Sequence, residues 1–153
     1  MQKKGLTYEE ALNRCETLCS RCEHSTGEME RKLRQWGVSS ADADRIICHL
    51  LDERYIDNHR FARAFALDKA RYNSWGRIKI AQHLRVLGVE EADVQYGLSE
   101  IPDDEYLASL HTVLERKLRS LTDEDDFTRR GKLVRHALSH GFEMELVLKA
   151  VEE

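Results

Sequence analysis

The chain has 153 residues and a formal net charge of −4; 41% of its residues are hydrophobic and 34% are charged. This length allows one ordinary domain or a few small ones laid end to end. No apolar run approaches the roughly 20 residues of a membrane-spanning helix, and the first lysines are not followed by the apolar part of a secretory signal. We therefore expect a cytoplasmic protein without a membrane partner, and the net charge argues against simple coating of DNA.

Helices are the predicted elements along the whole chain. One proline and eight glycines provide little of the punctuation that strands and hairpins need. Apolar residues recur at helical spacing, and helix-capping residues such as Ser25 (with Glu28) and Asp57 precede several of these runs. The pattern predicts nine helices, at residues 7–24, 26–36, 40–54, 58–72, 75–87, 90–99, 103–120, 123–139 and 143–152.

One pattern occurs three times in the chain. Gly37, Gly88 and Gly141 each end an amphipathic helix, at intervals of 51 and 53 residues. A nearly constant period indicates stacked units rather than one domain folded around a pocket, and stacked units usually present a long surface to a macromolecule. We predict an all-α fold of three tandem three-helix repeats, at 1–56, 57–101 and 102–153. Leu51 and Leu118 are among the residues expected inside.

Charge is segregated along the chain, and the second repeat is basic. Residues 58–89 carry seven Lys or Arg and one acid, whereas residues 90–128 carry three Lys or Arg and twelve Asp or Glu. This layout suits a partner with both anionic and cationic surface, such as a protein bound to nucleic acid; ordinary solvated helix faces are the alternative. The candidate partner-binding residues are Arg60, Arg63, Arg71, Trp75, Arg77, Lys79 and Arg85.

Trp75 is the aromatic member of this candidate face. Arg77 and Lys79 follow it at a predicted helix start, where free backbone amides favour a phosphate or a carboxylate. Trp75 can stack on a base or fill a hydrophobic socket of a partner. The competing interpretation is that Trp75 belongs to the core and that the cations are solvated.

A cluster of thiols near the start is the main chemical candidate. Cys15, Cys19 and Cys22 have the C-x3-C-x2-C spacing of radical S-adenosylmethionine enzymes, but that motif follows a strand of a barrel, and this chain predicts no strand. At i, i+4 and i+7 the thiols share one helical face, and with His24 they cannot surround a metal tetrahedrally from a continuous helix. We interpret them as core packing, and we predict no metal, no cofactor and no catalytic site.

Short segments in all three repeats combine residues in distinctive patterns. In the second they are Tyr55-Ile-Asp-Asn-His-Arg-Phe-Ala-Arg-Ala-Phe65, Ser74-Trp-Gly-Arg77 and His83-Leu-Arg-x-x-Gly-Val89; in the others they are Ser25-x-x-Glu-Met29 and Gly131-Lys-Leu133. Together they resemble the RecX family of RecA regulators over about residues 11–152. Asn58 and His140 depart from the family pattern, which usually has Asp and Arg at these positions.

The resemblance implies an elongated, curved array of small bundles that is not an enzyme. Members of this family bind the RecA filament on single-stranded DNA in its helical groove. They restrain its ATP hydrolysis, strand exchange and the co-protease function that triggers the SOS response in DNA repair. We expect this chain to be such a modulator and to be a monomer, and we leave open whether it also contacts DNA directly. Two alternatives stay open: a helical DNA-binding transcription regulator, and an enzyme with a metal or cluster at the three thiols.

Overall fold

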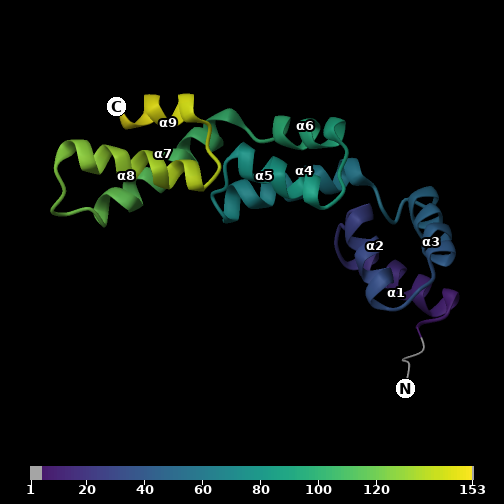
Figure 1. The fold of residues 1–153 in the computed structure, drawn as a ribbon. Helices are drawn as coiled ribbons and strands as arrows, with labels where there is room; N and C mark the ends of the chain where they lie inside the picture. Colours follow the sequence, from purple (N-terminus) through teal and green to yellow (C-terminus); the bar gives the residue numbers. More distant parts are fainter. Residues whose placement is uncertain (1–4, 153) are drawn as a thin grey trace, which may run out of the picture.

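The computed structural model describes residues 5–152, and these form α-helices without any strand (Figure 1). None of these helices is long and apolar enough to cross a membrane. The predicted helices are confirmed, with ends shifted by a few residues. Their bounds are α1 (Tyr8–Arg21), α2 (Thr26–Gln35), α3 (Ser40–Asp52), α4 (Asn58–Tyr72), α5 (Arg77–Val86), α6 (Glu91–Ser99), α7 (Asp103–Arg119), α8 (Asp126–Ser139) and α9 (Met144–Val151).

The helices form three successive bundles: a first unit (α1–α3), a second unit (α4–α6) and a third unit (α7–α9). Figure 1 shows the second and third units end to end, with the first unit set at an angle to them. The molecule is therefore an elongated, bent rod. This confirms the predicted array of three-helix units.

The glycine at the middle of each unit ends its second helix as the sequence predicts. Gly37, Gly88 and Gly141 have φ of 73°, 82° and 94°, which is the left-handed region. Beyond Gly37, the amide of Val38 donates to the carbonyl of Leu33 at 3.0 Å. This is the Schellman arrangement, in which a glycine lets the chain leave a helix while helix-end carbonyls keep partners.

Two hydrophobic cores hold the rod together. The first unit has its own core, and the second and third units share a continuous one. Tyr106 and Phe142 of the third unit lie in that shared core with ring centroids 5.2 Å apart, and Ile101 connects the two units within it. The second and third units therefore form one body, to which the first unit is attached separately.

Two residues predicted to be inside are not. Leu51 is 40% exposed and Leu118 is 45% exposed. Leu51 follows Leu50, which is fully buried, and an adjacent residue lies about 100° farther round the helix. Leu118 lies in the last turn of α7, one turn beyond Leu114, the last buried residue of that helix. A three-helix unit is too small to bury more than a narrow stripe of each helix.

The units meet at the glycine turns through close backbone contact. Between the second and third units, the amide of Gly76 donates to the carbonyl of His140 at 2.7 Å, and the amide of Ile78 donates to that of Gly141 at 3.0 Å. These carbonyls end α8 and have no amide of their own helix to accept from. The start of α5 therefore caps the end of α8.

In the other two units, the carbonyl just before the turn glycine also accepts a hydrogen bond from a preceding segment. Between the first and second units, the hydroxyl of Ser25 donates to the carbonyl of Leu87 at 2.8 Å, and Gly27 lies against this carbonyl. In the first unit, the amide of Leu6 donates to the carbonyl of Trp36 at 3.0 Å. One kind of contact thus recurs at each turn glycine.

We expect Gly76→Ala to lower the free energy of unfolding by about 2 kcal/mol, the usual scale of overpacking. A methyl group built on Gly76 would lie 2.2 Å from the carbonyl carbon of Gly141, so backbone has to move. Gly131→Ala is the control, since Gly131 lies inside α8 with its nearest neighbour 3.5 Å away, and alanine there should add up to about 1 kcal/mol. Urea unfolding measures both. Equal stability of the two variants would contradict the close contact.

Candidate partner-binding surface

The basic residues of the predicted face lie on α4 and α5, and each of its arginines is paired with a carboxylate. The sequence places these acids in other segments, so the local positive charge is largely neutralised in space. A side-chain hydrogen bond to Glu23 raises the pKa of Arg60. The pairs are Arg60 with Glu23 (2.7 Å), Arg63 with Glu100 (3.2 Å), Arg71 with Glu105 (3.1 Å), Arg77 with Asp103 (3.0 Å) and Glu143 (2.8 Å), and Arg85 with Glu91 (2.7 Å).

Three of these arginines connect neighbouring units. Arg60 reaches Glu23 in the loop before α2 of the first unit. Arg71 and Arg77 reach carboxylates of the third unit. Isolated exposed pairs contribute little to stability, so these pairs add to the contacts between the units without being their main source of stability.

Arg77 is the most enclosed of the five, with a side chain that is 26% exposed. Its guanidinium lies 3.9 Å from the centroid of the Tyr106 ring, and its backbone amide donates to the Tyr106 hydroxyl at 2.9 Å. That hydroxyl donates in turn to Glu143. Burial and this hydrogen bond raise the pKa of Tyr106 above its ordinary value. Arg77 is therefore built into the joint between the second and third units.

Lys69, Trp75 and Lys79 are arranged differently. The two ammonium groups lie 5.0 and 4.8 Å from the centroid of the Trp75 ring. Neither lysine has an ion pair within residues 5–152. Trp75 is half-buried and packs edge-on against Phe65 at a centroid distance of 6.3 Å. Trp75 thus belongs partly to the core, as the competing interpretation has it, and carries two cations that remain available to a partner.

The structure also reveals a basic groove that the sequence does not predict, between α1 and α2. It has a volume of about 410 Å³. The Arg14 guanidinium lies 5.5 Å from the Trp36 ring centroid, and neither Arg14 nor Lys32 has an ion pair in the described part of the chain. Residues 1–57 have no excess of cations, so only the folding of two helices against each other brings the groove together. Its lining residues are Asn13, Arg14, Thr17, Leu18, Lys32 and Trp36.

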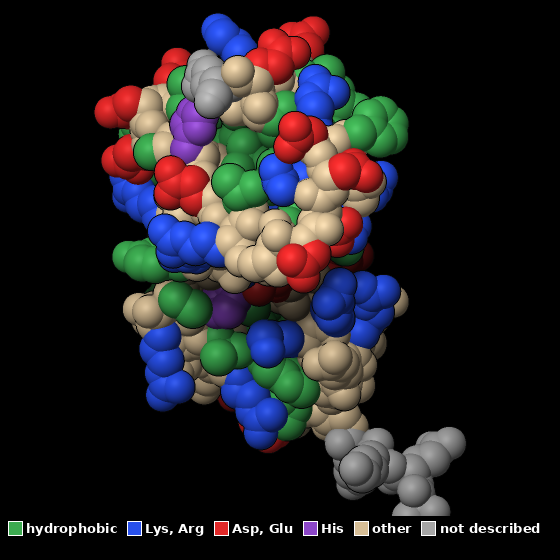
Figure 2. Space-filling model, turned by 90° about the vertical axis from the view of Figure 1, so that its left-hand side faces the viewer, with side chains coloured by type: hydrophobic (Ala, Val, Ile, Leu, Met, Phe, Trp, Pro, Cys, Tyr) green, Lys and Arg blue, Asp and Glu red, His purple; other side chains and the backbone are tan. Residues whose placement is uncertain are grey.

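Figure 2 shows the rod from the end of the third unit. The view faces the third unit, on which acidic and basic side chains alternate. Lys and Arg side chains gather with hydrophobic ones on the lower part of the view, where the first unit lies.

The thiols do not all pack as predicted. Cys15 is fully buried in the core of the first unit, whereas Cys22 is exposed. The reason is that α1 ends at Arg21, so Cys22 has an extended backbone and leaves the helical face. Within the described residues, no three His, Cys, Asp or Glu side chains are close enough to hold a metal ion.

Comparison with known proteins gives the same family for all three units. Models of the first, second and third three-helix domains of RecX match residues 11–50, 57–98 and 103–151. The Regulatory protein RecX of Pelodictyon phaeoclathratiforme is 30% identical over 84% of this chain and 78% of its own length. That of Bacillus cytotoxicus is 26% identical over 82% of this chain, which spans 47% of that protein. The crystal structure of RecX from Lactobacillus salivarius has a TM-score of 0.83 at 17% identity, covering 95% of this chain and 94% of that one.

We expect Tyr106→Phe to lower the free energy of unfolding by about 1–2 kcal/mol, because the hydroxyl has two partners in a buried setting. Tyr96→Phe is the matched control: its hydroxyl has one partner, Glu100 at 3.0 Å, and it is less buried. The control should change stability by less than about 0.5 kcal/mol. Urea unfolding compares them, and a neutral Tyr106→Phe would remove this hydroxyl from the joint.

The Arg85–Glu91 pair should be visible in a titration. Hydrogen bonds from Arg85 and Gln95 lower the pKa of Glu91 from 4.5 to about 2. A carboxyl whose pKa is lowered by folding stabilises the fold above its unfolded pKa and loses this effect as the pH falls toward 2. In Arg85→Gln, the pKa of Glu91 should return most of the way to its ordinary value, as measured by NMR of the side-chain carboxyl carbon. An unchanged pKa would mean that the pair does not persist in solution.

Proposed function

Since the chain belongs to the RecX family, we propose that it binds the RecA filament on single-stranded DNA and restrains it. Three stacked units in one rod are the observation that carries this proposal. A rod can contact several successive protomers of a filament, and each contact raises the effective concentration of the next. Bridging of protomers slows ATP turnover, strand exchange and co-protease action together. On this proposal the protein acts in the cytoplasm, as a monomer and as a regulator rather than an enzyme.

The cores support a stiff contact surface. The second and third units share one core and are joined by Arg77, Tyr106 and Glu143. A surface spanning both units therefore keeps its shape on binding, so that little conformational entropy is lost when a second protomer is contacted. The first unit has a separate core and can adjust its angle at the polar joint.

Within the second unit, we assign partner contact chiefly to Lys69, Trp75 and Lys79. Neither lysine has an ion pair among the described residues, so a carboxylate or phosphate of the filament can bind them without breaking one. Arg60, Arg63, Arg71, Arg77 and Arg85 of the predicted face each have a carboxylate already.

The groove of the first unit supplies a second contact in this proposal. Arg14 and Lys32 have no ion pair within residues 5–152, and Trp36 lines the same groove. Cations that neutralise phosphates bind DNA through release of counterions, and this binding weakens with salt. The two basic surfaces thus provide contacts at separate positions along the rod.

Co-sedimentation with RecA filaments on single-stranded DNA, with ATP turnover measured alongside, tests the proposal. The chain should pellet with filaments and lower ATP hydrolysis. Lys69→Glu with Lys79→Glu should weaken both effects about tenfold or more, because each lost charge contact is worth on the order of 1 kcal/mol. Lys149→Glu is the control for each charge reversal, since Lys149 is exposed, has no ion pair in the described part of the chain and lies on α9 of the third unit.

The outcomes separate the function from its assigned residues. A folded chain that neither pellets with filaments nor changes ATP turnover contradicts the proposed function. Full inhibition by the folded double-lysine variant leaves the function intact and removes the second-unit contact. Tight, sequence-specific binding to duplex DNA without RecA would favour the transcription regulator instead.

A further inference from the structure

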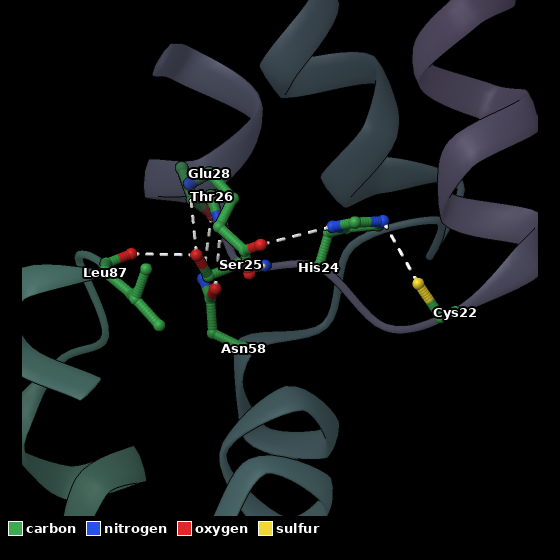
Figure 3. A network of polar contacts seen from close by, with 7 residues as sticks. All are labelled: Cys22, His24, Ser25, Thr26, Glu28, Asn58 and Leu87. Carbon is green, nitrogen blue, oxygen red and sulfur yellow. Dashed lines mark hydrogen bonds and ion pairs between the residues drawn. The ribbon is translucent and has the colours of Figure 1, made fainter. Parts of the chain in front are cut away.

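An exposed thiol of the first unit is connected to a histidine and a carboxylate (Figure 3). The sulfur of Cys22 lies 3.3 Å from Nε2 of His24, and Nδ1 of His24 lies 3.3 Å from Oε2 of Glu28. These three residues lie where α1 ends and α2 begins. Neither the core nor the proposed partner surfaces include this cluster.

The geometry defines the direction of the hydrogen bonds. A carboxylate only accepts, so Nδ1–H of His24 donates to Glu28, and Nε2 is left to accept from the Cys22 thiol. The side chains of His24 and Glu28 are 13% and 27% exposed, so the imidazole is held in place. A thiol next to a base that is itself oriented by a third group is the general arrangement of an activated nucleophile.

We propose that Cys22 is a modification site for small disulfides, with His24 as the base that accepts its proton. The Cys22 thiolate attacks one sulfur of the disulfide, a sulfur–sulfur bond forms, and the bond within the disulfide breaks. The leaving thiolate takes the proton from His24 and departs as a thiol. The Cys22 thiol is oxidised to a mixed disulfide, and half of the small disulfide is reduced. This reaction does not depend on the proposed function.

The other cysteines provide an internal comparison. Burial raises the pKa of Cys15 to about 11, and burial together with nearby Glu23 raises that of Cys19 to about 11. Both therefore keep their protons near neutral pH and react slowly. Cys48 is exposed like Cys22, but its thiol forms no hydrogen bond within the described residues. Cys48 thus measures the reactivity that exposure alone gives.

The cluster lies next to the joint between the first and second units, as Figure 3 shows. Oε1 of Glu28 accepts from the amide of Ser25 at 3.1 Å, and the Ser25 hydroxyl donates to the carbonyl of Leu87. A group attached to Cys22 would therefore lie three contacts away from a hydrogen bond that joins the units.

The test is the rate at which each cysteine of the folded, full chain reacts with glutathione disulfide, followed by peptide mass spectrometry. Cys22 should react at least about tenfold faster than Cys48, because a positioned base commonly contributes more than this. His24→Asn should lower the rate at Cys22 to about that at Cys48 and leave Cys48 unchanged. His49→Asn, next to Cys48, is the matched control and should alter neither rate.

Glu28→Gln provides a second variant that keeps the fold. Glutamine can still accept from the Ser25 amide in the capping box, but it no longer stabilises a protonated His24. This variant should also slow Cys22. Equal rates at Cys22 and Cys48 in the unaltered chain would overturn the proposal, as would an unchanged Cys22 rate in both folded variants.

Discussion

The rod depends on hydrogen bonds to carbonyls at helix ends. Each unit leaves a helix-end carbonyl beside its turn glycine, and the preceding segment donates to that carbonyl: Leu6 to Trp36, Ser25 to Leu87, and Gly76 to His140. Such carbonyls have no partner in their own helix, and leaving them buried without one is costly. Small residues at the contact allow the backbones to approach. Stacking of units is thus a way of capping helices.

The two joints between the units are not equally strong. The joint between the second and third units adds a continuous hydrophobic core and the enclosed Arg77, Tyr106 and Glu143 to its backbone contacts. The joint between the first and second units has polar contacts, among them the amide of Thr26 with the side chain of Asn58 at 3.0 Å. Apolar burial supplies most of the stability of a fold. Bending of the rod therefore belongs at the first joint.

Charge that is concentrated in a sequence is not necessarily free in the structure. Residues 58–89 are strongly basic, yet their arginines are matched by acids of the neighbouring segments. Among the cations that have no ion pair within residues 5–152, Lys69 and Lys79 lie on an aromatic ring, and Arg14 and Lys32 line a groove. On the proposed function, the recognition surface is therefore assigned by which cations lack a carboxylate, rather than by their local density.

The sequence by itself determined the helices, their capping and the threefold repeat, because helical periodicity and the glycine stops are local properties of the chain. The sequence also predicts that the second unit is basic, and it includes Trp75 and Lys79 among the candidate partner-binding residues. Three features were decided only by the tertiary structure: the division into two cores, the pairing of the arginines, and the meeting of Arg14 with Trp36. Each of them joins residues from different helices. Their distances depend on how the helices pack, and a one-dimensional pattern does not contain that information.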